Sequence, residues 1–444
     1  MVEHKDSHED ILLAPIAHTG PGFYWAVAGL GVFILWGAIA YGFQFYYGLG
    51  VTGLQQPVGW GFYVTNFVFF IGISHAGTLI SAILRLSRAE WRRPITRMAE
   101  VITAMVLFIG AGQILVDMGR PDRIFNVIRH GRYQSPLLWD ATSISAYLTA
   151  SLTYLYLPMI PDIAILRDRL GKWKLFYSVL ALGWTGTEAQ QRVLNRAIAI
   201  MCVLVIPVAV SVHTVVSFVF SMTLQPMWHS TIFGPYFVVG AIFSGIAALI
   251  VAMIIFRKAY GLEPFLKPIH FRYLGQLLLI MALLWFYFTF AEYLTGYYGA
   301  EPEEMKIFWS KFSGPFWPFF WAMVLCNFII PLACLVRLGQ HTVGKVLAAS
   351  LSIIVGMWLE RFIIVVPTLS IPRLPFPQTI YVPTWVELGV FAGSLALFAL
   401  FYLLFTKVFP IISIWEIREG REEGVKEVEE RIKSYLPDEV NGAA

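Results

Sequence analysis

Ten long apolar segments constrain this chain more than any other feature of its sequence. A helix that crosses a lipid bilayer needs about 20 mostly apolar residues. Such segments fall at 22–47, 60–85, 98–118, 136–158, 195–221, 232–256, 272–297, 313–336, 344–367 and 384–407. Only 14% of the 444 residues are charged, against roughly 25% in soluble domains, so a water-soluble fold would leave much of its exterior apolar. The sequence predicts an all-α integral membrane protein of about ten spanning helices.

Two short motifs indicate an internal repeat. The motif SPLLW (Ser135–Trp139) opens the fourth apolar segment, and SGPFW (Ser313–Trp317) opens the eighth. The second and sixth segments end at equivalent arginines, Arg85 and Arg257. The repeat predicts two four-helix bundles, made of helices 2–5 and helices 6–9, with helices 1 and 10 at their flanks.

The distribution of basic residues predicts the orientation in the membrane. With the N-terminus on the inner side, 24 lysines and arginines fall in inner segments and seven in outer loops. We therefore expect a cytoplasmic N-terminal segment (1–21), a transmembrane domain (22–407) and a cytoplasmic amphipathic tail (408–444), in the inner membrane of a prokaryote. Four arginines lie in the outer loop 119–135, which would dock an acidic partner or rest on lipid phosphates. The seven outer residues are Arg120, Arg123, Arg129, Arg132, Lys306, Lys311 and Arg373.

The cysteines and the basic residues argue against several classes of site. Cys202, Cys326 and Cys334 lie in apolar segments without CxxC spacing, so we expect no disulfide framework and no zinc or iron–sulfur site in this chain. Basic residues do not alternate with aromatic ones in a stripe, so we expect no nucleic acid as partner. The expected surroundings are membrane lipid.

His75 is the clearest titratable residue within the apolar segments. It lies near the middle of the second segment, in FFIGISHAGTLISAIL, among small neighbours that let a helix or a flat ligand approach closely. Titratable side chains are costly in hydrocarbon, so they usually face the bundle interior and serve a function. We predict a catalytic role for His75. The alternative is a neutral histidine that links two helices by hydrogen bonds.

Asp140 lies about one turn into the fourth segment from the outer side, in SPLLWDATSISAYL. Helical spacing places Asp140, Ser143, Tyr147, Ser151 and Tyr154 on one face. We predict that Asp140 is catalytic and that Ser143 and Tyr147 relay protons. The alternative is that this stripe holds helices together, and it suits the deeper members of the stripe better.

Further titratable or polar residues gather in the outer halves of other segments. Together they predict a polar chamber that opens outward, where they would bind a substrate or relay protons. For Arg361 and Glu387 a charge at the membrane interface or a local ion pair is the better interpretation. The remaining candidates are Gln113, Asp117, His213, Glu292 and Glu360.

The histidines and aromatic residues favour a quinone over haem. Haem b needs paired axial histidines, and only His75 and His213 lie well inside segments, at different apparent depths. A quinone needs an apolar, aromatic cleft and a histidine and a carboxylate that exchange protons with its ring oxygens. The chain has both groups, and 16% of its residues are aromatic.

Several stretches of the chain resemble the NrfD/PsrC family, the quinone-interacting membrane subunits of polysulfide-reductase-like complexes. The resemblance runs nearly end to end and is strongest to the ten-helix branch with the ActC and ActF subunits of alternative complex III. The stretches are VTGLQQPVGWGFYVTNFVFFIGISHAGTLISAIL (51–84), SPLLWDATSISAYL (135–148), IPDIAILRDR (160–169), SVHTVVSFVF (211–220), WHSTIFGPYFVVGAIFSG (228–245) and YVPTWVE (381–387).

The resemblance implies a quinol site near the outer side, docked against an iron–sulfur subunit. It further implies a multihaem cytochrome c or molybdopterin subunit in the complex, menaquinone as the expected quinone, and no haem or iron–sulfur cluster in this chain. His75 and Asp140 match family positions for quinol binding and proton handling, and His213 lies in the matched SVH segment. Relatives in the alternative-complex-III branch often carry an acidic residue after SVH, where this chain has Val219. This departure puts the family's proton route through this half in doubt.

We expect quinol to bind in the first bundle near the outer face, where His75 and Asp140 accept its protons. Its electrons would pass to the iron–sulfur partner, with or without proton translocation. The reverse direction, as in a quinone-reducing anchor of a molybdopterin enzyme, uses the same site.

Two alternatives remain. One is a secondary transporter, which broken helices and inverted repeats would favour. The other is a purely structural anchor.

Overall fold

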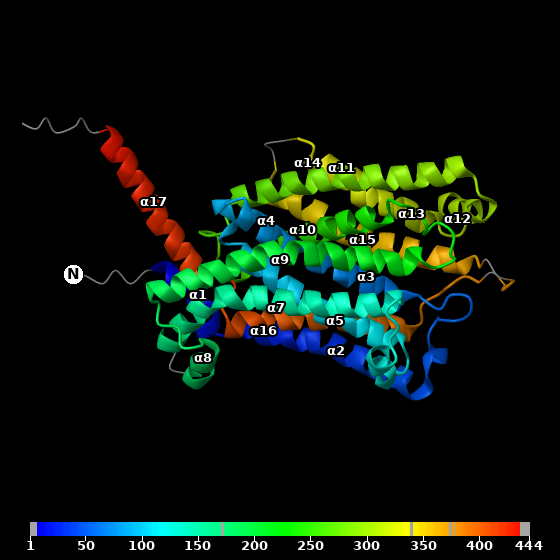
Figure 1. Cartoon of the computed structure of the whole chain (residues 1–444), viewed down its shortest axis with the longest axis horizontal. Coiled ribbons are helices and arrows are strands. Elements are labelled where there is room, and N and C mark those ends of the chain that lie inside the picture. Colours follow the sequence, from blue (N-terminus) through cyan, green and yellow to red (C-terminus); the bar gives the residue numbers. More distant parts are fainter. Residues whose placement is uncertain (1–6, 170–172, 338–340, 373–374, 378, 436–444) are drawn as a thin grey trace, which may run out of the picture.

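The computed structural model describes residues 7–169, 173–337, 341–372, 375–377 and 379–435, and helices dominate these ranges (Figure 1). Ten helices there are long and apolar enough to cross a membrane, which confirms the predicted all-α membrane architecture. They are α2 (Pro21–Tyr47), α3 to α4 (Phe62–Leu86), α5 (Thr96–Asp117), α7 (Pro136–Arg169), α9 (Glu188–Ser221), α10 (Phe233–Ala259), α11 (Pro268–Gly299), α13 to α14 (Trp317–Leu335), α15 (Val343–Ser370) and α16 (Trp385–Val408).

Short helices cover the two ends of this bundle. We call the end that carries α1 and α17 the tail end, and the opposite end the α12 end (Figure 1). Because successive spans alternate in direction, both ends of the described chain lie at the tail end. The short helices are α1 (Ser7–Ala17), α6 (Asn126–Arg129), α8 (Lys174–Leu180), α12 (Pro302–Phe312) and α17 (Ile414–Tyr435). Single 3₁₀ turns are η1 (Leu49–Val51), η3 (Glu90–Arg92) and η4 (Pro121–Phe125). The expected position of Arg373 lies outside the described residues.

Helices α7 and α9 are longer than the apolar segments that predicted them. The prediction ended the fourth helix at 158, but α7 continues to Arg169 through Pro158 and Pro161. Likewise α9 begins at Glu188 rather than 195. A search for about 20 consecutive apolar residues misses these extensions because their residues are more polar. Both extensions lie at the tail end (Figure 1), and α7 and α9 pack against each other.

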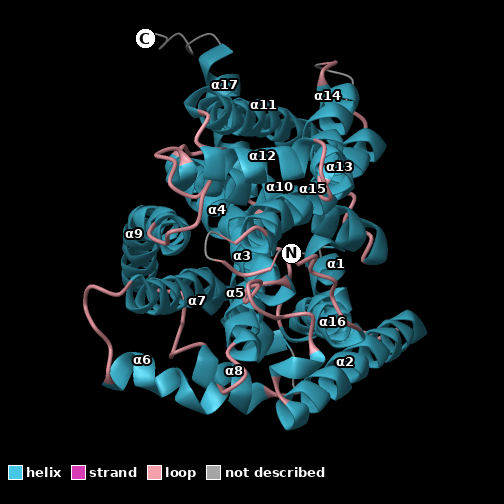
Figure 2. Ribbon diagram, turned by 90° about the vertical axis from the view of Figure 1, so that its right-hand side faces the viewer, coloured by secondary structure: helices cyan, strands magenta, loops and turns pink. Residues whose placement is uncertain are grey.

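The helix α3 lies at the centre of the bundle, and α2 lies at its edge (Figure 2). Small residues allow α2 to approach α16 closely: a Cβ added to Gly37 would lie 2.9 Å from the Gly393 Cα. The helix α3 packs against α5 and also extensively against α10. The division into two four-helix bundles therefore stays a prediction.

The α3 to α4 span changes its helical pitch directly after His75. The chain forms α3 (Phe62–His75), a π-helical stretch η2 (Ala76–Ile80) and then α4 (Ser81–Leu86). A Cβ at Gly77 would overlap the Ala99 carbonyl, so glycine lets η2 lie directly on α5. A second π-helical stretch, η5 (Leu325–Ile329), joins α13 (Trp317–Val324) to α14 (Ile330–Leu335). Such stretches often occur at functional sites.

Buried ion pairs hold α17 to the tail end. Glu416 accepts hydrogen bonds from Arg85 at 2.7 Å and Arg92 at 2.8 Å. Burial alone would raise the pKa of Glu416, but the two arginines lower it below its ordinary value. The Asp162 carboxylate accepts from the Trp415 backbone N–H at 2.9 Å and pairs with Arg97. An acidic side chain here offsets the exposed N–H groups of the helix start.

Candidate functional site

His75 and His213 form the centre of the candidate site. Their side chains project from α3 and α9, are fully buried, and meet edge to face with 3.7 Å between ring centroids. The His75 Nε2 lies 2.6 Å from the Ala209 carbonyl oxygen, so this nitrogen carries the proton. Neither ring nitrogen of His213 has a hydrogen-bond partner. Because buried polar atoms normally have one, His213 is suited to bind a polar ligand.

The histidine contact changes the argument about haem. The sequence placed His75 and His213 at different depths, and this prediction is wrong because the two rings are in contact; residue positions counted along two helices do not fix their relative depth. The two rings nevertheless do not fit a shared haem. Two axial imidazoles need room for the macrocycle between them, and a centroid separation of 3.7 Å leaves none.

The predicted stripe on α7 faces α3. Tyr147 is fully buried, donates to the Ser74 carbonyl at 3.1 Å, and its ring centroid lies 5.3 Å from that of His75. Farther toward the tail end, the Tyr154 and Ser81 hydroxyls are 3.0 Å apart. These contacts support helix packing as the role of the deeper residues. Tyr147 differs because it also lies against the histidine pair.

Asp140 lies at the α12 end of the same helix face. Its side chain is 7% exposed, and its Oδ1 has no hydrogen-bond partner. The Ser143 hydroxyl donates to the Asp140 backbone carbonyl at 3.0 Å, not to the carboxylate. Asp140 and Tyr147 are two turns apart, about 10 Å along the helix. A carboxylate thus lies two turns toward the α12 end from a phenol, and this phenol packs against the pair of imidazoles.

A buried ion pair on α15 lies on the other side of the histidines. Arg361 is 1% exposed, and of its two predicted interpretations, a charge at the membrane interface or a local ion pair, the structure shows the ion pair. Its Nη1 lies 3.0 Å from the Glu360 carboxylate, and its guanidinium carbon lies 4.8 Å from the centre of the Phe237 ring. Glu360 also accepts from Trp285 Nε1 at 2.5 Å. The helix continues to Ser370, which places the pair about 14 Å from its end.

Gln113 and Asp117 belong to a different group, between α5 and α16. Gln113 donates to the Ser394 hydroxyl at 2.8 Å, while Oδ1 of Asp117 has no partner. Nearby, Glu387 is fully buried and accepts from the Gly53 N–H at 2.7 Å. Glu387 also caps the start of α16, and its position at the membrane interface stays a prediction. The structure does not bring this group to the histidines.

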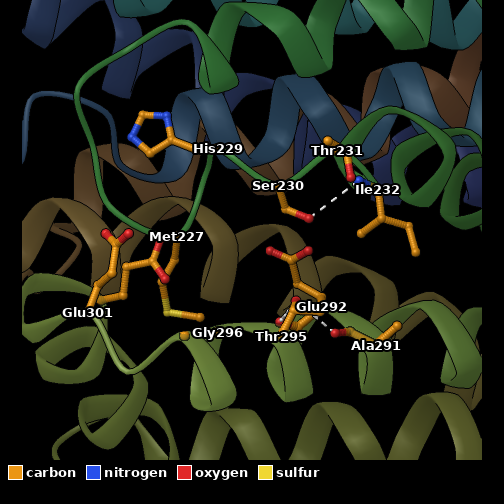
Figure 3. A pocket seen from close by; sticks show the side chains of 12 residues that line it. Met227, His229, Ser230, Thr231, Ile232, Ala291, Glu292, Thr295, Gly296 and Glu301 are labelled. Atoms are coloured by element: carbon orange, nitrogen blue, oxygen red, sulfur yellow. Dashed lines mark hydrogen bonds between the residues drawn. The ribbon is translucent and has the colours of Figure 1, made fainter.

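Glu292 lies in a separate cavity of about 420 Å³ at the α12 end (Figure 3). Its carboxylate is 9% exposed and points into the cavity below Ser230, and its Oε2 has no hydrogen-bond partner. Glu292 lines this cavity without any other predicted site residue, so those residues do not share one chamber. The lining residues are Met227, His229, Ser230, Thr231, Ile232, Ala291, Glu292, Thr295, Gly296, Gly299, Glu301 and Glu304.

A buried lysine lies close to this cavity. Lys311 on α12 is 3% exposed, and its ammonium lies 5.7 Å from the centre of the Tyr293 ring. Burial lowers the pKa of Lys311 to about 8, although Glu292 opposes that shift. The sequence placed Lys311 in an outer loop and missed its burial. Arg361 was also missed as a site residue, although its place beside Glu360 in an apolar segment was a usable signal.

Comparison with known proteins supports the family expected from the sequence. A model of the polysulphide reductase NrfD family matches residues 50–372, which is more than half of the chain. The chain belongs to this family. The match includes the helices that carry His75, Asp140, His213, Glu292 and Glu360. The narrower resemblance to the alternative-complex-III subunits stays a prediction.

Three relatives illustrate the range of this NrfD family. A putative membrane subunit of the dimethyl sulfoxide reductase of Halobacterium salinarum is 27% identical over 51% of this chain and 50% of its own length. A selenate reductase subunit from Mesobacillus selenatarsenatis is 23% identical over 82% of this chain and 89% of its own. The Hdr-like menaquinol oxidoreductase integral membrane subunit of Archaeoglobus fulgidus is 25% identical over 88% and 95%. This chain thus spans half of the first relative and nearly all of the other two.

Proposed function

We propose that this chain is the quinone-interacting membrane subunit of an oxidoreductase complex and that it oxidises menaquinol. One observation carries the proposal: the Tyr147 ring packs against His75, which contacts His213, and Asp140 lies two turns away on the same helix as Tyr147. Asp140 and His213 both have buried polar atoms without a hydrogen-bond partner. The named menaquinol relative, 95% of whose length is matched, supports the choice of quinone.

The two groups fit the proton chemistry of a quinol. Oxidation of one quinol releases two protons and two electrons, so two proton acceptors are needed at the ring oxygens. Asp140 accepts one proton toward the α12 end. The histidine pair accepts the other at a free ring nitrogen of His213, while His75 stays bound to Ala209. General bases of this kind must lie within hydrogen-bond reach of the proton they take.

The electrons pass to a partner in this proposal. The acceptor is an iron–sulfur subunit docked at the α12 end, in a complex that also holds a multihaem cytochrome c or a molybdopterin subunit. The loop 119–135 offers the docking surface. Its arginines Arg120, Arg123, Arg129 and Arg132 lie on exposed positions, as an acidic partner would require. With the tail end cytoplasmic, in the inner membrane of a prokaryote, the site faces outward.

The alternatives make different demands on the same residues. A quinone-reducing anchor would run the reaction in reverse, with Asp140 and His213 as proton donors. Gln113, Asp117, Glu292 and Glu360 lie in other clusters, so we propose them as proton relays rather than as quinol ligands, and any proton translocation would use them. A secondary transporter is disfavoured because α9 continues unbroken through Pro207. The π-helical stretches in two other spans are its best support.

The test uses the complex purified through an affinity tag on this chain. We expect His213→Ala and Asp140→Asn to slow menaquinol oxidation by at least about 100-fold, the usual contribution of general acid–base groups. His341 is the matched histidine control, because it is also buried and bonds the Leu335 carbonyl at 2.8 Å. The exposed Asp168 is the matched aspartate control. Wild-type rates in both site variants would exclude this site, and substrate uptake by the isolated chain would favour the transporter.

A further inference from the structure

Two neighbouring cavities lie between α2, α10 and α16, and together we call them the composite groove. The first has a volume of about 330 Å³ and is lined by residues of α2, α3, α5, α10, α15 and α16. The second has a volume of about 640 Å³ and lies between α1, α2, α10 and α16. Both are lined by Ile255, Phe256 and Leu403, so they adjoin each other. Each volume lies within the range of roughly 300–1,000 Å³ that is typical of sites for small ligands.

The first cavity is apolar along its whole length. Its walls include Leu30 from α2, Phe69 and Ile73 from α3, Ala252 from α10, and Phe398 from α16. Because successive residues of a helix are about 100° apart around its axis, Phe69 and Ile73 face away from His75 on α3. This cavity is therefore separate from the candidate quinol site. Its walls suit a hydrocarbon chain.

The second cavity ends at a lysine. Lys407, in the last turn of α16, lines it together with His18 and Tyr260. The ammonium donates to the Pro15 carbonyl at 2.7 Å and to the His18 carbonyl at 3.0 Å. The Phe23 ring lies 5.0 Å away. Among the described residues, no carboxylate lies within ion-pair distance of Lys407, so two neutral carbonyls hold it in place while its charge is not neutralised.

We propose that this composite groove binds one phospholipid with an anionic headgroup. One acyl chain fills the apolar cavity, and the headgroup phosphate lies at Lys407 beside α1. The order of the parts matches that of a lipid: the hydrocarbon cavity lies toward the middle of the bundle, and the cation lies at its end. A lysine near the end of a spanning helix attracts anionic lipid headgroups electrostatically. The proposal does not depend on the quinol chemistry.

A quinone fits this groove less well than a phospholipid. A quinone headgroup is neutral and needs hydrogen-bond partners, whereas Lys407 offers an uncompensated positive charge. A lipid with a zwitterionic headgroup would fill the apolar part but would leave Lys407 near a headgroup without net charge. Charge complementarity therefore selects an anionic lipid.

The test is native mass spectrometry of the delipidated, detergent-solubilised protein, with phosphatidylglycerol or phosphatidylcholine added back. We expect one tightly bound phosphatidylglycerol and a preference over phosphatidylcholine of about fivefold, the factor for one basic residue at a membrane surface. The Lys407→Ala variant should lose this preference, and Lys407→Arg should keep it. The matched control is Lys345→Ala, at an exposed lysine near the tail end of α15.

A second variant tests the hydrocarbon part and does not involve the lysine. Ala252→Phe fills the first cavity and should abolish tight binding of both lipids, whereas Ala38→Phe, on the exposed side of α2, should not. If Lys407→Ala does not fold, the Ala252→Phe result alone decides. Equal binding of both lipids to the wild type, or unchanged phosphatidylglycerol binding in Ala252→Phe, would overturn the proposal. The proposal would also be overturned if menaquinone were bound in the groove and were displaced by Ala252→Phe but not by Lys407→Ala.

Discussion

The imidazole rings of His75 and His213 touch edge to face, with their centroids 3.7 Å apart, although the two residues are far apart in the chain. The two histidines are not equivalent. His75 is tied to α9 through the Ala209 carbonyl, whereas the His213 nitrogens have no partner. His75 therefore positions the pair, and His213 is available to exchange a proton with a ligand.

This difference predicts opposite effects of two leucine substitutions on stability. His213→Leu should leave the melting temperature unchanged or raise it, because it replaces two unpartnered polar atoms with an apolar side chain of similar volume. His75→Leu should cost about 1 kcal/mol, the usual net value of one hydrogen bond. Both should slow menaquinol oxidation. Thermal unfolding in detergent and steady-state kinetics would check this, and a destabilised His213→Leu would show that its nitrogens are partnered.

The ion pair of Glu360 and Arg361 should behave as one unit. Arg361→Met should destabilise the protein by roughly 3–5 kcal/mol, because it leaves a buried carboxylate without its counter-ion. The double variant Glu360→Gln/Arg361→Met should recover much of this loss, since the amide oxygen still accepts from Trp285. A double-mutant cycle of thermal unfolding measures the coupling. Additive losses in the double variant would contradict a buried pair.

Lys311 should make stability depend on pH in the alkaline range. Its pKa in the folded protein is about 8, while that of an unfolded lysine is about 10.4. Between these values the unfolded chain binds more protons, so stability should rise with pH, by up to about 3 kcal/mol, and stay flat below pH 8. Lys311→Met should remove this rise. Parallel unfolding curves at pH 7 and pH 10 for both proteins would check it, and an identical slope would contradict it.

The contact between Asp162 and α17 should control the protease resistance of the tail. Asp162→Asn weakens the pairing with Arg97 and the bonds from the start of α17. We expect trypsin to cut at the exposed Arg418 and Arg421 about tenfold faster or more, because bonds to charged groups contribute about 1.5–3 kcal/mol. Asp168→Asn, on an exposed site, is the control. Equal cleavage of all three proteins would show that α17 is held by other contacts.

The sequence predicted the ten spans because lipid-facing helices must be apolar, whatever their partners. It could not predict the tail-end extensions of α7 and α9, because their residues are more polar and the apolar signal ends before them. His75 stood out as a titratable residue in an apolar run, but its contact with His213 depends on helix tilt and on the heights of helix ends. The local ion pair of Arg361 with Glu360 was one of the two interpretations that the sequence left open.

The predicted site residues show a similar division. Tyr147, His75 and His213 meet because their helices α7, α3 and α9 pack together, and Asp140 lies two turns from Tyr147 on α7. Gln113 and Glu292 lie between other pairs of helices. That all these residues are in the outer halves of their apolar segments was not enough to bring them together. Local spacing identified the stripe on α7, but the partners of that stripe are set by packing.

Photochemical cross-linking with a menaquinone analogue that carries an azide on its ring tests the central claim most directly. The complex is irradiated with the analogue, and the labelled peptides are identified by mass spectrometry, with excess menaquinone as competitor. We predict competed labelling on α7 near Asp140 and on α9 near His213, reduced in Asp140→Asn. Competed labelling confined to the cavity of Glu292, or to the groove that ends at Lys407, would contradict the proposed quinol site.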